Sequence, residues 1–214
     1  MYNYNISPDI TVIDQLGNNR NERDDRQRCG NITLEEVQSA IKTIKNGKAP
    51  GVDSIPAELL KAGGEHVSSI LHKICSKAWQ EGTWPSQWTK SILLTLFKKG
   101  DIKRCENYRT ISLISHPSKV LIKILLERLK PQIEKILTDE QAGFRSGRST
   151  TEPFCNLRVL CEKQVEKGHA LHHNLVDFKK AFARIWQKVR LKILRIMIFD
   201  SKLVDMIETL YNDL

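Results

Sequence analysis

The 214-residue sequence predicts an α+β fold in which helices are interleaved with a few short strands. Residues 67–79 and 120–129 carry apolar side chains at helical spacing. Residues 91–97 and 108–114 are β-competent and flank a turn sequence, which predicts an antiparallel hairpin. A hydrophobic content of 40% is compatible with a packed core, and the length allows one large domain or two small ones.

The charge of the chain favours an anionic partner. The net charge is +9, and between Trp88 and Lys130 ten lysines and arginines stand against three acidic residues. Phosphate neutralisation by such residues dominates nucleic-acid binding, so RNA or DNA is the leading partner class.

The spacing of the cysteines and the lack of long apolar runs indicate where in the cell the protein is expected. Five cysteines without a C-x-x-C pair do not suggest a disulfide framework, which predicts a reducing environment. Cys155 and Cys161, with His169, His172 and His173 nearby, do not have the spacing of a zinc ribbon or finger. No secretory signal and no bilayer-length apolar run is visible, so we expect a soluble intracellular protein, nuclear or cytoplasmic, without a membrane partner.

The first ordered element is expected after a disordered leader. We expect residues 1–31 to form this leader. No apolar side chain occurs between Gly17 and Arg28, so burial there cannot offset the conformational entropy that the chain would lose on ordering. A capping box at Thr33 and Glu36 then begins a helix that we expect to end at Gly47. The folded region is thus expected to cover residues 32–214.

A tight loop and two helices follow. Residues 48–53 contain a Pro-Gly turn signal, and residues 56–62 predict a short helix that begins with proline. The helix around residues 67–79 should be stopped by Gly82. The loop 84–88 carries two tryptophans, which we expect to anchor it on the core.

The hairpin turn is basic. The sequence Lys98-Lys99-Gly-Asp joins the two predicted strands, so the hairpin would bring both lysines near Arg109. Such a cluster could bind phosphates, but charged hairpin tips are also common as solvated surface. Both interpretations remain open from these residues.

Residues 118–137 predict a long amphipathic helix that Pro131 should kink or restart. The side chains expected to face inward are Val120, Leu121, Ile124, Leu125 and Leu129. The loop 138–151 contains Arg145, Arg148 and Phe144, a combination suited to a nucleic-acid backbone, although a simple polar connection is the alternative.

The stretch that leads to Asp177 is the candidate catalytic segment. After a helix over 154–165, Leu171, Leu175 and Val176 predict a short, mostly buried strand that ends at Asp177. This carboxylate suits a divalent metal ion, and the alternative is a cap on the following helix. Helices are expected over 189–199 and 203–211.

Five motifs in order resemble the reverse transcriptases of LINE-type, non-LTR retrotransposons. They are Asn46-Gly-Lys-Ala-Pro-Gly-Val-Asp53-Ser-Ile-Pro-Ala-Glu-Leu-Leu-Lys61, Lys98-Lys-Gly-Asp101, Asn107-Tyr-Arg-Thr-Ile-Ser-Leu113, Glu140-Gln-Ala-Gly-Phe-Arg-Ser-Gly-Arg148 and Asp177-Phe-Lys-Lys-Ala-Phe182. The resemblance covers about Thr33 to Leu214. It implies a right-hand polymerase architecture, of which this chain matches the fingers and the first part of the palm.

The resemblance also implies an RNA-directed DNA polymerase that uses an RNA template, a DNA primer, a deoxynucleoside triphosphate and Mg²⁺ or Mn²⁺ ions. Asp177 matches the first catalytic metal ligand. Phe178 and Phe182 match positions beside the incoming nucleotide. Arg109, with Lys98 or Lys99, matches the residues that grip the triphosphate.

Arg145 and Arg148 would lie along the template or primer backbone. Two departures from the family pattern stand out. Ala183 replaces a usual acidic residue, and no Asp-Asp pair follows Asp177. We therefore expect a truncated polymerase that is inactive alone. The alternatives are a non-catalytic RNA- or DNA-binding protein derived from a mobile element, and a structural or interaction module.

Overall fold

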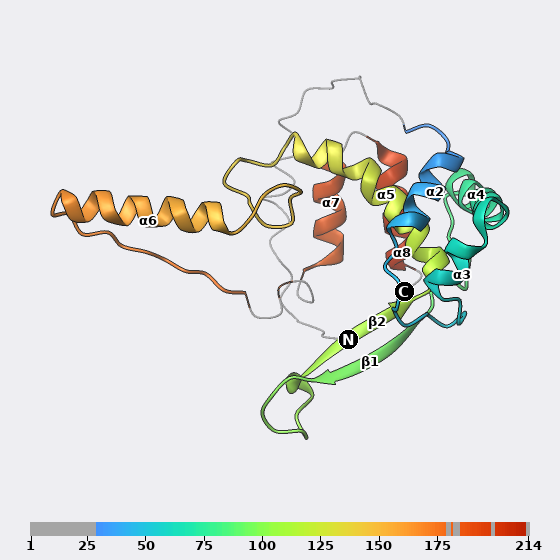
Figure 1. The fold of residues 1–214 in the computed structure, drawn as a ribbon, viewed down its shortest axis with the longest axis horizontal. Coiled ribbons are helices and arrows are strands. Elements are labelled where there is room, and N and C mark those ends of the chain that lie inside the picture. Colours follow the sequence, from blue (N-terminus) through green and yellow to red (C-terminus); the bar gives the residue numbers. More distant parts are fainter. Residues whose placement is uncertain (1–28, 179–180, 182–184, 198–199, 213–214) are drawn as a thin grey trace.

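The computed structural model describes residues 29–178, 181, 185–197 and 200–212. Most of the helices form one body, and the two-stranded hairpin and one helix, α6, extend away from it (Figure 1). In chain order the elements are α2 (Leu34–Thr43), α3 (Ala57–Ala62), α4 (Gly64–Glu81), β1 (Ser91–Phe97), the 3-10 helix η1 (Cys105–Asn107), β2 (Tyr108–Ile114), α5 (His116–Glu134), α6 (Thr151–Glu166), α7 (Gln187–Met197) and α8 (Ser201–Asn212).

The capping box predicted for α2 is confirmed. The Glu36 backbone N–H donates to Thr33 Oγ1, and the Thr33 N–H donates to the Glu36 carboxylate at 2.8 Å. The predicted end at Gly47 is wrong, because α2 ends at Thr43, where Ile44 takes an extended conformation. Gly47 is left-handed, but its N–H bonds to the Glu58 carboxylate on α3 and not to a carbonyl of α2.

Helix α4 has the predicted C-terminus but a narrower buried face. Gly82 ends it in the left-handed conformation, with φ 68°. Ile70 and Ile74, which share the predicted apolar stripe, remain 45% and 37% exposed. Both lie at the edge of the stripe, whereas Leu71 and Cys75 at its centre are buried.

Helix α5 is the central packing element. All five side chains predicted to face inward are buried. Ser115 caps the helix, since its side chain accepts from the Ser118 N–H. The helix runs on through Pro131 to Glu134, so the expected restart at the proline does not occur.

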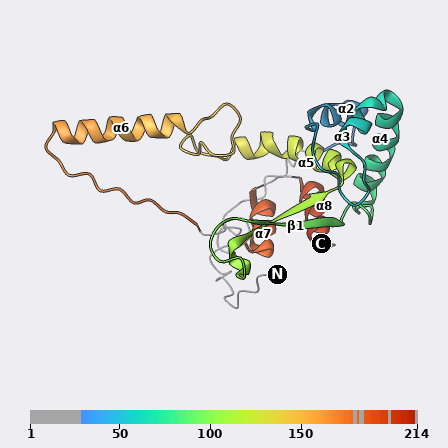
Figure 2. The same ribbon diagram turned by 60° about the horizontal axis from the view of Figure 1, so that its bottom comes forward.

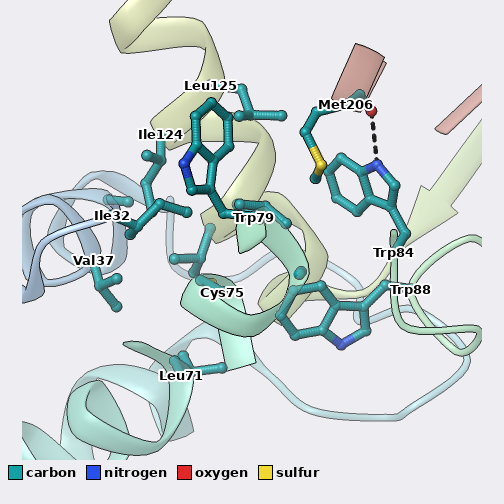
Figure 3. Close-up of a cluster of buried hydrophobic side chains, with 14 of the residues drawn as sticks. Ile32, Val37, Leu71, Cys75, Trp79, Trp84, Trp88, Ile124, Leu125 and Met206 are labelled. Atoms are coloured by element: carbon teal, nitrogen blue, oxygen red, sulfur yellow. Dashed lines mark hydrogen bonds between the residues drawn. The ribbon is translucent and has the colours of Figure 1, made fainter. Parts of the chain in front are cut away.

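Tryptophans connect this core to the C-terminal helix. Trp79, Trp84 and Trp88 are 1%, 6% and 8% exposed, which confirms the expected anchoring of the loop after α4. Trp84 Nε1 donates to the carbonyl oxygen of Met206 at 2.8 Å, as Figure 3 shows. Since Met206 lies on α8, the contact joins residues 122 positions apart in the sequence.

The hairpin has the predicted strands, paired antiparallel from Ser91 opposite Ile114 to Phe97 opposite Tyr108. Its side chains are mostly exposed on both faces. The sheet of the described residues contains these two strands only. The helices and this antiparallel hairpin confirm the helix-rich α+β class.

The predicted buried strand before Asp177 is wrong. Residues 169–178 have no regular secondary structure, and Leu175 and Val176 are 93% and 76% exposed. A strand is stabilised by hydrogen bonds to a neighbour, and no described strand pairs with this segment.

Helix α6 forms where a helix was predicted, but it does not supply a buried face. It points away from the helical body in both views (Figures 1 and 2). None of its described side chains is buried, and Phe154 is 70% exposed. Within the described residues, no helix combines the length and apolar character needed to cross a membrane.

Candidate functional site

The tip of the β1–β2 hairpin carries the predicted cation cluster. Arg109 stands opposite Leu96, and the Lys98 N–H donates to the Asn107 carbonyl at 2.8 Å, which extends the ladder by one pair. Lys98 and Arg109 are therefore diagonal neighbours on the same side of the hairpin, with Cα atoms roughly 7–8 Å apart. Lys99 begins the bend that follows.

The tip is held by its own polar contacts. Asp101 accepts from the Lys103 N–H at 2.9 Å, and Asn107 Nδ2 donates to the Asp101 carbonyl at 2.8 Å. Tyr108 donates its hydroxyl to the Ile102 carbonyl and packs edge-on against Phe97, with ring centroids 5.5 Å apart. These contacts order the loop from which the cations project.

The three cations have no acidic partner among the residues that the structure describes. No ion pair joins Lys98, Lys99 or Arg109 to a described carboxylate. The nearby Asp101 carboxylate is engaged in its own turn. The hairpin therefore presents like charges whose mutual repulsion an anion would relieve.

Arg145 is held by contacts within the chain. Its guanidinium bonds to the Glu134 carboxylate and to the carbonyls of Thr138 and Gln141, and its side chain is only 7% exposed. These bonds raise its pKa above the usual value, with Glu134 as the largest cause. Arg145 thus fastens the loop 138–150 to the end of α5.

Arg148 is more accessible. It pairs with Asp139 at 2.8 Å and with Glu152 at 3.6 Å, and its side chain is 34% exposed. Both partners are themselves largely exposed, so the pairing is open to solvent and to competing anions.

Asp177 and Phe178 are exposed and lie in the irregular segment after α6, where Phe178 is 74% exposed. Phe182 and Ala183 lie outside the described residues. Within the described part of the chain, Asp177 forms no ion pair with the hairpin cations. Among the described residues, Asp177 and the hairpin cations are therefore not joined directly.

The described side chains only partly match the divalent metal site that the resemblance implies. The Asp177 carboxylate is a hard oxygen ligand of the kind that Mg²⁺ and Mn²⁺ accept. Across residues 29–178, 181, 185–197 and 200–212, however, no group of three or more His, Cys, Asp or Glu side chains could hold a metal ion. Asp177 by itself does not make a metal site.

The loop 51–55 packs against the base of the hairpin, a contact that the sequence did not indicate. A Cβ on Gly51 would lie 2.5 Å from the Ser115 nitrogen, so the backbone of the loop touches the junction between β2 and α5. His116 then binds the same loop, since its Nδ1 is 2.8 Å from the Ile55 carbonyl. The Pro-Gly pair was a visible turn signal, but its partner at Ser115 was not visible.

The comparison with protein families is decisive. Residues 97–213 match the family described as reverse transcriptase (RNA-dependent DNA polymerase), which is more than half of the chain. The chain belongs to the reverse transcriptase family. Reverse transcriptases generally use divalent metal ions and act on a nucleic-acid template and primer with nucleotide substrates.

The relatives specify the branch of the family. The chain is 31% identical over 72% of its length to the probable RNA-directed DNA polymerase from transposon BS of Drosophila melanogaster. It is 25% identical over 72% of its length to the RNA-directed DNA polymerase from mobile element jockey of the same species. It is 26% identical over 84% of its length to an uncharacterised 149 kDa protein of transposon TX1 of Xenopus laevis.

These names support a non-LTR, LINE-type reverse transcriptase, as the motifs predicted. The chain spans 17% of the BS and jockey proteins and 14% of the TX1 protein. It therefore corresponds to a small part of those relatives.

Proposed function

We propose that this chain forms the fingers and the first part of the palm of an RNA-directed DNA polymerase of a non-LTR retrotransposon. In this role it binds an RNA template, a DNA primer and a deoxynucleoside triphosphate. The family match and the order of the five motifs support this assignment.

The observation that carries the proposal is the cation cluster at the hairpin tip, which forms no ion pair with a carboxylate of the described residues. Lys98 and Arg109 lie on one side of the hairpin, and Lys99 follows at the bend. An ammonium and a guanidinium at this spacing can each donate to a different phosphate of a triphosphate, with charge-assisted hydrogen bonds. Phe178 and Phe182 would pack beside the sugar of the nucleotide.

The hairpin is tested by the binding of a fluorescently labelled deoxynucleoside triphosphate. We expect the triple variant Lys98→Gln, Lys99→Gln, Arg109→Gln to bind at least tenfold more weakly, since a hydrogen bond to a charged group contributes about 1.5–3 kcal/mol. The control Lys73→Gln, Lys77→Gln, Arg158→Gln removes the same charge from α4 and α6. An equal weakening of binding in the two triple variants would contradict the role of the hairpin.

Asp177 is proposed as the first metal ligand of the palm. Primer extension needs more carboxylates than this one, so we expect residues 1–214 to bind template and primer without extending the primer. Extension with Mg²⁺ or Mn²⁺ that is abolished by Asp177→Ala would overturn this expectation. Tighter Mn²⁺ binding by the wild type than by Asp177→Ala, followed by manganese electron paramagnetic resonance, would support the ligand role independently of activity.

For the nucleic acid, we propose that Arg148 contacts the backbone and that Arg145 positions the loop for it. This division follows from the accessibility of the two side chains, 34% against 7%. We expect Arg148→Gln to weaken the binding of single-stranded RNA without changing cleavage of the loop after Glu140 by a glutamate-specific protease. Arg145→Gln should increase cleavage after Glu140, because the loop loses its hydrogen bonds to Arg145.

A further inference from the structure

A second basic site lies away from the hairpin tip. A cavity of about 190 Å³ opens where the C-terminal end of α2 meets the beginning of α5. Its lining includes four lysines and one histidine, and no acidic residue contributes to it. These residues are Lys45, Lys48, His116, Lys119 and Lys123. The volume is several times the roughly 30 Å³ that one water occupies in the liquid.

The lysines come from two segments that the fold brings together. Lys119 and Lys123 are one helical turn apart on α5, so they share a face. Lys45 and Lys48 follow the end of α2. Like charges at this spacing destabilise a helix, and only Lys123 has a carboxylate partner among the described residues, Glu127 at 3.4 Å. An anion in the cavity would remove this repulsion.

His116 gives the cavity a buried polar atom without a partner. The residue is fully buried, and its Nδ1 is bonded to the Ile55 carbonyl, which requires a proton on Nδ1. Nε2 is buried and has no hydrogen-bond partner in the described part of the chain. Buried polar atoms are nearly always bonded, and in the imidazolium form Nε2 can donate to an anion oxygen.

The distance between the cavity and the hairpin tip favours a ligand other than the nucleoside triphosphate proposed for the tip. The residues from Arg109 to His116 run along β2, which separates the two sites by roughly 20–25 Å. A nucleoside triphosphate held at the tip therefore cannot also fill the cavity, whereas a polynucleotide bound beside it can supply a phosphate there. The cavity lining contains no Phe, Tyr or Trp ring on which a base could stack, and its four ammonium groups suit a phosphate.

We propose that the cavity between α2 and α5 binds a backbone phosphate of a single-stranded polynucleotide. This inference rests on the proposed function, because it adds a second contact point for the nucleic acid that the loop 138–150 would also bind. The contact is independent of base sequence.

The test uses a fluorescent 20-nucleotide single-stranded RNA and the 214-residue chain, with anisotropy measured across a salt series. The variant Lys48→Gln, Lys119→Gln is compared with Lys73→Gln, Lys77→Gln, which removes two charges from α4. We expect the cavity variant to bind about tenfold more weakly than the control variant. The slope of log affinity against log salt should also be shallower by about 0.7 for each phosphate that the variant no longer neutralises.

A third variant, His116→Asn, keeps a donor for the Ile55 carbonyl but removes Nε2. We expect it to melt near the wild-type temperature in circular dichroism and to bind RNA more weakly. RNA affinities that are equal for the cavity and control variants would overturn the proposal. A second outcome would also overturn the proposal. If the wild type and the cavity variant bind RNA equally, but inorganic phosphate raises the melting temperature of the wild type only, the cavity binds a free anion and not a polynucleotide. Wild-type protein that fails to bind RNA would instead contradict the proposed function.

Discussion

The guanidinium of Arg128 forms a two-point ion pair with the Glu36 carboxylate, with N–O distances of 2.7 and 2.8 Å. The same guanidinium donates to the carbonyls of Gly30 and Asn31 and lies 4.9 Å from the centre of the Trp79 ring. One side chain of α5 thus joins the segment before α2, the first turn of α2 and the core face of α4.

We expect Arg128→Lys to destabilise the fold by about 1.5–3 kcal/mol, because lysine cannot reproduce the planar, two-point geometry and would leave carbonyl oxygens without donors. The free energy of unfolding in urea measures this effect. The control is Arg158→Lys, whose partner Glu162 lies one turn along the exposed helix α6. If both substitutions shift the urea midpoint equally, the geometry of Arg128 is not the cause.

The Arg128–Glu36 pair also predicts a pH dependence. Burial alone would raise the pKa of Glu36, but hydrogen bonds from Arg128 and Thr33 outweigh it and hold the pKa below its usual value of 4.5. Because the folded pKa is the lower one, the ionised carboxylate stabilises the fold above about pH 4.5, and this contribution is lost as the pH falls through the folded pKa.

Melting temperatures measured from pH 6 to pH 3 would check this prediction. Glu36→Gln should melt lower than the wild type at pH 6 and should lose less stability on acidification. The other carboxylates are common to both proteins, so they cancel in the comparison. Parallel curves for the two proteins would contradict the prediction.

Gly51→Ala should destabilise the base of the hairpin. The new Cβ would lie 2.5 Å from the Ser115 nitrogen and 2.7 Å from the Ile114 carbonyl carbon, so backbone must move. Overpacking of this kind costs about 1–3 kcal/mol. Gly30→Ala is the matched control, because no atom lies within 4 Å of its added Cβ. Thermal unfolding of both variants separates the clash from a general glycine effect.

The thiol of Cys29 should react slowly. Burial and a hydrogen bond to Asp200 raise its pKa from 9.0 to about 11, which lowers the thiolate fraction at pH 8 about a hundredfold. Asp200→Asn removes the charge but keeps an oxygen that can accept from the Lys202 N–H, as Asp200 does now. We expect this variant to accelerate Cys29 alkylation, although not to the rate of an exposed thiol, because burial remains.

Peptide mapping of the alkylated protein would follow each cysteine separately. Cys75, whose pKa burial raises to about 12, should stay unmodified in both proteins, and exposed Cys105 should react rapidly in both. An unchanged Cys29 rate in Asp200→Asn would show that the carboxylate does not control the thiol.

The sequence by itself determined the local structure and the family. The capping box at Thr33, the left-handed stop at Gly82, the buried stripe of α5 and the two hairpin strands depend on residues near one another in the chain. Their physical causes, hydrogen bonds within a helix end and periodic apolar contacts, are visible in a short window. The ordered motifs likewise identified a non-LTR reverse transcriptase.

Only the tertiary structure decided what depends on distant partners. The apolar run before Asp177 predicted a buried strand, but burial needs a neighbouring strand, and Leu175 is 93% exposed. The sequence did not show that the Arg145 guanidinium bonds to Glu134 and to two carbonyls of its own loop. His116 and Lys48 are far apart in the sequence, and packing of α5 beside the end of α2 places them in one cavity. Charge and periodicity are properties of the chain, whereas the partner of each charge is set by the fold.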